Sequence, residues 1–213
     1  MSNINKPKKK SKILLLAIAA LAIYFGYHIV KNLAHRLGNK PVSIEQAAGR
    51  ALETLQNDAQ EVGFEEAQER ARERGNARLD GLKTTDKVIA AALGFFGIEY
   101  KLAESYEAYC KNHGVLLPNM RKYTYNLNKP VHDKAVALLD KHGISEEDIK
   151  NNILIPLEPQ LLQAIEMELT SIIKDTGQTI KDLCEELERT APQNKTLEVR
   201  TQNPTIVEII ENN

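Results

Sequence analysis

The pattern of hydrophobic and polar positions starts with eighteen residues without a formal charge, Ile13–Val30, directly after a cluster of lysines. An α-helix of this length is about 27 Å long, which is enough to cross the hydrocarbon core of a bilayer. We therefore expect a single transmembrane helix at residues 13–30. A basic tail at 1–12 would precede this anchor, and a linker at 31–42 would follow it.

Basic residues on the two sides of the anchor predict its orientation. Five lysines precede the apolar run, whereas three basic residues follow it closely, Lys31, Arg36 and Lys40. Lys and Arg are retained on the cytoplasmic side, so the N-terminus is expected in the cytoplasm and the bulk of the chain in the periplasm or another extracytoplasmic space. The predicted location is the cell inner membrane, with the lipid bilayer as the partner of Ile13–Val30.

Two other interpretations of the apolar run stay open. One is a cleaved signal peptide, because Ala20-Leu21-Ala22 has the small residues of a cleavage site. Against it, the apolar stretch continues from Ile23 to Val30, past the point where such a segment normally ends. The other is a helix buried in the core of a soluble protein.

Residues 43–82 are expected to form an amphipathic helix and a charged arm. A capping box opens at Ser43, and apolar residues then recur at helical spacing. After Gly63 the segment is dense in charge and its apolar stripe is thin, so we expect a solvated arm. Gly75 and Gly81 are expected to bracket a linker.

Residues 83–190 are expected to form the helical core. A helix from Thr84 or Thr85 to about Asn112, closed by Gly114, is apolar nearly all round in its first half and is predicted to be central.

The rest of the core is predicted to hold a loop and two further helices. Residues 115–128 have an irregular pattern and indicate a loop. A short amphipathic helix is expected from Pro130 to Gly143. The longest helix, about Gln160–Arg189, keeps the phase of its apolar stripe through Gly177.

The C-terminal residues 191–213 alternate in their first half and contain a turn signal. A β-hairpin, a short helix and a disordered tail are all compatible with this pattern, and we favour an extended tail. The chain has no tryptophan, few aromatic residues and many helix formers. The predicted fold class is therefore all-α: a transmembrane helix followed by an irregular helical bundle, ending in a short β-hairpin or an extended tail.

The charge balance argues against one class of partner. All 29 acidic residues follow residue 30, but five of the 28 Lys and Arg residues precede it, so the rest of the chain has a net charge of −6. A dedicated nucleic-acid-binding domain should be basic. We therefore expect no nucleic-acid partner.

Known catalytic and cofactor signatures are missing from the sequence. It contains no phosphate-binding glycine loop, nucleophile elbow, HExxH or CxxC motif. The three histidines outside the anchor and its flanking residues, His113, His132 and His142, do not have the i, i+4 spacing of metal ligands on a helix. We predict no catalytic residue, no cofactor and no metal site, which weakens the enzyme hypothesis without excluding it.

The two cysteines, Cys110 and Cys184, lie on or beside the apolar stripes of two predicted helices. A disulfide between them is plausible if the domain is extracytoplasmic. The alternative is a pair of buried, inert thiols.

Five of the seven tyrosines fall between Tyr100 and Tyr125. The predicted loop after the central helix therefore brings tyrosines together with basic residues, and it is the best candidate for an interaction surface. Its residues are Arg121, Lys122, Tyr123 and Tyr125. The alternative is a loop packed by its tyrosines with solvated lysines.

Three hypotheses for function follow. The first is a non-enzymatic structural or interaction protein, which presents its helical domain to an unknown protein partner on the extracytoplasmic side. The second is a ligand-binding module with a pocket between helices near the tyrosine-rich segment. The third is an enzyme of unrecognised type, and a form secreted after signal cleavage also stays open. A pocket that clusters tyrosines with an acid or histidine of shifted pKa would favour the second or third.

Overall fold

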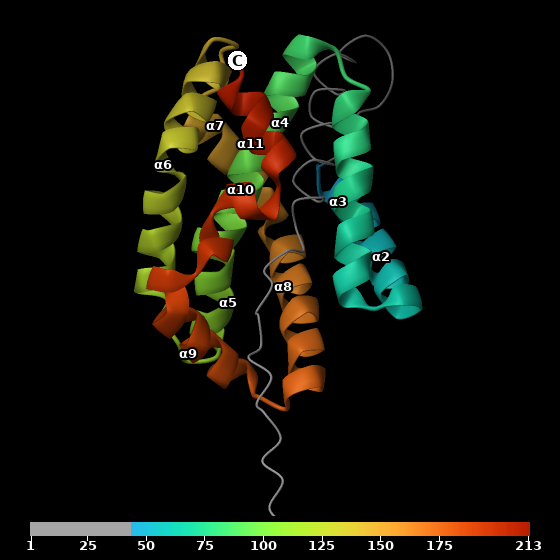
Figure 1. Cartoon of the computed structure of the whole chain (residues 1–213), viewed down its shortest axis with the longest axis vertical. Helices are drawn as coiled ribbons and strands as arrows, with labels where there is room; N and C mark the ends of the chain where they lie inside the picture. Colours follow the sequence, from blue (N-terminus) through green and yellow to red (C-terminus); the bar gives the residue numbers. More distant parts are fainter. Residues whose placement is uncertain (1–43) are drawn as a thin grey trace, which may run out of the picture.

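The computed structural model describes residues 44–213, which form helices and no strand (Figure 1). The predicted all-α class is confirmed for this part of the chain. The basic tail, the predicted anchor at 13–30, the linker and Ser43 lie outside the described residues. Within residues 44–213, none of the helices combines the length and apolar character that a bilayer crossing requires.

The first two described helices form a hairpin. Helix α2 (Ile44–Val62) and helix α3 (Phe64–Asp80) lie side by side, and the chain reverses at Gly63, where φ is 86° (Figure 1). The predicted solvated arm and linker are wrong, because α3 continues through Gly75 and packs against α2, α4 and α8. The residues that α3 buries are Ala67, Gln68, Gly75 and Leu79. One of its arginines, Arg74, pairs with Asp58 of α2 at 2.5 Å.

The central helix is confirmed. Helix α4 (Thr84–Tyr100), the π-helical turn η1 (Lys101–Ser105) and helix α5 (Tyr106–Asn112) are continuous, and Gly114 follows with a φ of 80°. Residues 90–99 are buried without interruption. Helices α6 and α11 both pack against α4, so its all-round apolar surface is covered.

Helix α6 (Pro118–Asp140) overturns two predictions. The segment 115–128 is not a loop beyond residue 117, and Pro130 lies inside a helix instead of starting one. Two polar residues of this segment, Thr124 and Asn128, face inward and form local hydrogen bonds. Buried Thr124 donates to the carbonyl of Met120, and buried Asn128 donates to the carbonyl of Thr124, both at 2.8 Å.

The next helices are continuous up to one break. They are helix α7 (Glu146–Ile149), the π-helical turn η2 (Lys150–Leu154), helix α8 (Ile155–Thr176) and, after the break, helix α9 (Ile180–Thr190).

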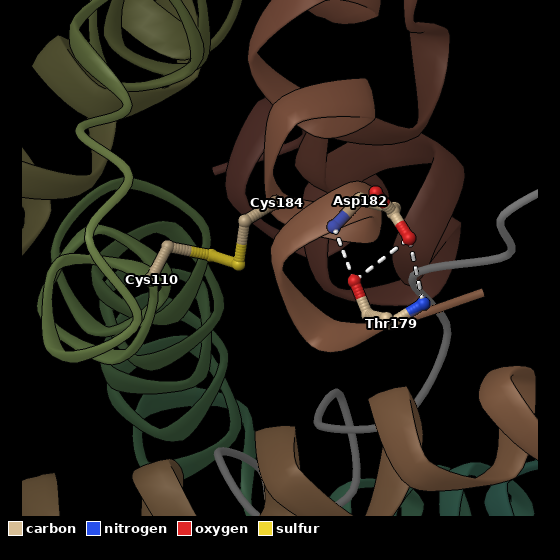
Figure 2. Close-up of a disulfide and its surroundings, with 4 residues drawn as sticks. All are labelled: Cys110, Thr179, Asp182 and Cys184. Carbon is tan, nitrogen blue, oxygen red and sulfur yellow. Dashed lines mark hydrogen bonds between the residues drawn. A yellow bond between two sulfur atoms is a disulfide. The ribbon is translucent and has the colours of Figure 1, made fainter.

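The predicted single helix from Gln160 to Arg189 is wrong, because α8 ends at Gly177, where φ is 72°. A new N-terminus follows at once, where the hydroxyl of Thr179 accepts the amide N–H of Asp182 and the carboxylate of Asp182 accepts the amide N–H of Thr179 (Figure 2). The apolar stripe keeps its phase on both sides of this break, so periodicity alone did not reveal it.

The C-terminal segment is helical, so the predicted extended tail or β-hairpin at 191–213 is wrong. It comprises η3 (Ala191–Gln193), η4 (Lys195–Leu197), α10 (Val199–Gln202) and α11 (Pro204–Glu211). The side chain of Asn203 caps α11 and Pro204 occupies its first turn, so the expected turn signal is a helix start. Ile206, Val207 and Ile210 of α11 are fully buried, and α11 packs against α4, α6 and α10.

Candidate ligand-binding site

A cavity of about 340 Å³ lies between α4, α6 and the continuous helix formed by α7, η2 and α8. This volume is within the range of small-molecule sites, which start at roughly 300 Å³. Both π-helical turns, η1 and η2, contribute side chains to its wall. Such turns inside α-helices occur often at functional sites, so their convergence on one cavity marks it as the candidate site.

The lining combines apolar and acidic side chains. The apolar and aromatic side chains are Phe96, Tyr100, Tyr125, Ile149, Leu154 and Ile155. The acidic side chains are Glu99, Glu104, Glu146 and Glu158. Two described basic side chains, His132 and Lys150, also line the cavity.

The most deeply placed charged group in this wall is Glu99, which is only 2% exposed. Its Oε2 lies 2.7 Å from Nδ1 of His132, whereas its Oε1 has no hydrogen-bond partner. The His132 ring packs edge-on against Phe96 with ring centres 5.1 Å apart, and its Nε2 lies 3.7 Å from Glu146. A buried acid and a half-buried base therefore form one unit at the cavity wall.

Burial and hydrogen bonding shift the pKa values of this pair. Burial raises the pKa of Glu99, although the hydrogen bond and charge of His132 oppose the shift. The hydrogen bond to Glu99 raises the pKa of His132, against the effect of its own burial, and the charge of Glu146 adds to the rise. Both groups therefore keep their protons to higher pH than they would in water.

Another part of the wall is organised around Glu104. Its Oε1 accepts the hydroxyl of Tyr125 at 2.6 Å and lies 3.0 Å from Nη2 of Arg121, which also pairs with Glu107 at 3.3 Å. Burial raises the pKa of Tyr100 to about 12 and that of Tyr125 further. Both tyrosines are neutral hydrogen-bonding phenols at physiological pH.

The four residues of the predicted interaction surface do not form one loop patch. Arg121 and Tyr125 are one turn apart on α6 and both contact Glu104. Tyr123 packs partly buried against the core, whereas Lys122 is exposed. The helix therefore directs these side chains to different faces, and an interaction role for the set stays a prediction.

A second buried ion pair lies away from the cavity. Nζ of Lys101 in η1 is 2.9 Å from Oε2 of Glu168 in α8, and the two side chains are 1% and 2% exposed. The ammonium also lies 5.4 Å from the centre of the Tyr106 ring. Burial lowers the pKa of Lys101 and raises that of Tyr106 well above its usual value. Sequence analysis missed this pair, whose members are on different predicted helices.

A disulfide joins Cys110 of α5 to Cys184 of α9 (Figure 2). The two Cα atoms are 5.7 Å apart, and the bridge closes a loop between positions separated by 74 in the sequence. Both residues are fully buried. From the sequence, this disulfide was expected only if the domain is extracytoplasmic. In the structure it links the central helix covalently to the segment after Gly177.

His113, His132 and His142 lie in different surroundings. His132 belongs to the cavity wall, whereas His113 and His142 are exposed. Nowhere in residues 44–213 do three or more His, Cys, Asp or Glu side chains group so that they could hold a metal ion. One signal for the Glu99–His132 unit was present in the sequence: Glu99 is the single charge in the otherwise apolar stretch 88–99 of the predicted central helix.

Comparison of the chain with protein-family models, with curated proteins and with solved structures found no match. The functional argument therefore rests on the cavity and on the groups that line it.

Proposed function

We propose that this chain is a single-pass membrane protein whose helical domain works on the extracytoplasmic side and binds a small ligand in the cavity around Glu99 and His132. The observation that carries the proposal is this cavity, which combines two tyrosines with an acid and a histidine of raised pKa. Between the first two hypotheses, this combination favours the ligand-binding module over a purely structural protein.

Two independent features support the extracytoplasmic location. Disulfides persist in oxidising compartments outside the cytoplasm, and Cys110 is bonded to Cys184. The excess of lysines before the apolar run Ile13–Val30 favours an N-terminus in the cytoplasm and a domain on the other side. The lipid bilayer is the proposed partner of that run.

The composition of the wall favours binding over catalysis. Among the described residues that line the cavity, none is Ser, Thr or Cys. A histidine held by a carboxylate commonly activates a hydroxyl or thiol nucleophile, and here the pair has none beside it in the wall. We therefore propose that Glu99 and His132 recognise a ligand.

The test uses the full-length protein in lipid nanodiscs with methyl-labelled isoleucine. A fragment library of anions, neutral compounds and cations is screened through the methyl signals of Ile149 and Ile155, which both line the cavity. We expect saturable shifts at these two methyls. If no compound of any charge shifts them, the proposed function is wrong.

A pair of matched substitutions checks where the fragments bind. Ile155 and Leu127 are similarly exposed, at 46% and 43%, but only Ile155 lines the cavity. Ile155→Trp should fill part of the cavity and abolish fragment binding, as measured by the Ile149 methyl signal. Leu127→Trp should leave fragment binding unchanged. Equal effects of the two substitutions would place the binding elsewhere.

A further inference from the structure

We propose that the cavity takes an organic cation, a primary ammonium or guanidinium group on an apolar stem, with the carboxylate of Glu99 as its counter-ion. This inference rests on the ligand-binding function proposed above and adds the chemical class of the ligand. It depends on more than a count of acidic side chains, because one buried carboxylate oxygen in the wall has no partner.

The first step concerns the carboxylate of Glu99. His132 occupies its Oε2, and its Oε1 is shielded from water without a hydrogen-bond partner. A buried acceptor without a donor is costly, more so when the group is charged. A ligand cation held against this carboxylate compensates its charge and lowers this cost. A ligand carboxylate or phosphate would instead bring a second negative charge against it.

The second step concerns the charge balance of the wall. Four carboxylates face one lysine, Lys150, and one histidine, His132. Arg121 neutralises part of the charge on Glu104, but it divides its guanidinium between Glu104 and Glu107. The wall therefore keeps a negative excess, which attracts cations and repels anions.

The third step separates an organic cation from a metal ion. The carboxylates and the histidine of the cavity are not grouped as metal ligands in the described part of the chain. An ammonium or guanidinium needs one close carboxylate and apolar surface for its stem. Ile149, Leu154 and Ile155 supply that surface, and the rings of Phe96 and Tyr100 add favourable contacts with a cation.

The experiment compares three compounds that share one stem and differ in charge: phenethylamine, 2-phenylethanol and 3-phenylpropanoate. Their affinities are measured through the Ile149 and Ile155 methyl signals of the full-length protein in phosphatidylcholine nanodiscs. We expect the amine to bind about tenfold or more tightly than the alcohol, as a charged hydrogen bond implies, and the carboxylate to bind least.

Three substitutions test the role of individual charges. Glu99→Gln keeps the shape of the side chain and should weaken amine binding about tenfold or more. Lys150→Met removes the lysine of the wall and should tighten amine binding about threefold. Glu147→Gln is the control, because Glu147 is exposed next to Glu146 and does not line the cavity. Its affinity for the amine should equal that of the wild type.

The outcomes separate this inference from the function on which it rests. If neither these compounds nor the wider library shifts the two methyls, the binding function itself fails. If the alcohol or the carboxylate binds as tightly as the amine, or if Glu99→Gln folds and binds normally, the cavity stays a binding site and the cation is wrong. If Glu99→Gln does not fold, Lys150→Met decides, and unchanged or weaker amine binding in that variant overturns the proposal.

Discussion

Asn128 on α6 tests how the C-terminal segment is held to the bundle. Asn128 is 1% exposed, and its side chain forms three hydrogen bonds. It donates to the carbonyls of Thr124 and Leu197, each at 2.8 Å, and accepts the amide N–H of Val199 at 2.7 Å. One amide side chain thus joins the middle of α6 to the end of η4 and the start of α10.

The substitution Asn128→Ala removes all three hydrogen bonds. Leu197 and Val199 are fully buried, so the carbonyl of one and the N–H of the other would lose their partner where water does not reach. Each buried group left unsatisfied costs roughly 1–3 kcal/mol. We therefore expect the free energy of unfolding to fall by about 3–5 kcal/mol, once the lost packing is included.

The assay is guanidinium unfolding of the full-length protein in detergent, followed by circular dichroism, together with hydrogen exchange at the Val199 amide. Asn126→Ala is the matched control, because Asn126 is exposed on the same helix and should change the unfolding free energy by less than about 0.5 kcal/mol. A loss below about 1 kcal/mol in Asn128→Ala, or an equally protected Val199 amide, would refute the reasoning.

Three further predictions concern the core, the cavity and the anchor. Phe96→Ala should lower the free energy of unfolding by about 3–5 kcal/mol, because Phe96 is buried at 3% exposure, whereas Glu69→Ala should cost less than about 0.5 kcal/mol; similar urea midpoints would contradict this. The pKa of His132 is raised above 6.5, so the folded state binds more protons than the unfolded chain above that pH. Stability should therefore decline as pH rises through the raised pKa, and thermal melts should show a smaller decline in His132→Asn but an unchanged one in His142→Asn. The protein should fractionate with membranes and resist alkaline extraction, and a soluble form that starts near Ile23 would show a cleaved signal instead.

Hydrophobic periodicity predicted a helix correctly where the signals for it lie within the helix itself. It failed where the structure of a segment is stabilised by residues far away in the sequence. The central helix was predicted with its ends because its apolar pattern and Gly114 are local signals. Within residues 118–128, the buried Asn128 finds its hydrogen-bond partners in Leu197 and Val199, which are about seventy positions away. A sequence pattern does not show that an inward asparagine will find such partners, so a polar segment with a proline was interpreted as a loop.

The same error concealed the candidate site. On a helix, Arg121, Tyr125 and His132 are separated by four and seven residues and share one face. On a loop, no such relation holds, so Tyr125 was grouped with Lys122 and His132 was considered only as a metal ligand. The pairing of His132 with Glu99 follows once α6 is a helix packed beside α4.

The two buried acids of this domain differ in what surrounds them. Glu99 and Glu168 are equally buried, and in each of them Oε1 has no hydrogen-bond partner. Glu168, however, faces a fully buried ammonium at 2.9 Å in a closed core, which compensates its charge without a ligand. Glu99 has only a half-buried imidazole as its partner, and it borders a cavity with three further carboxylates. A bound cation would therefore stabilise the carboxylate charge of Glu99 much more than that of Glu168. For this reason we assign the ligand to Glu99 and a structural role to Glu168.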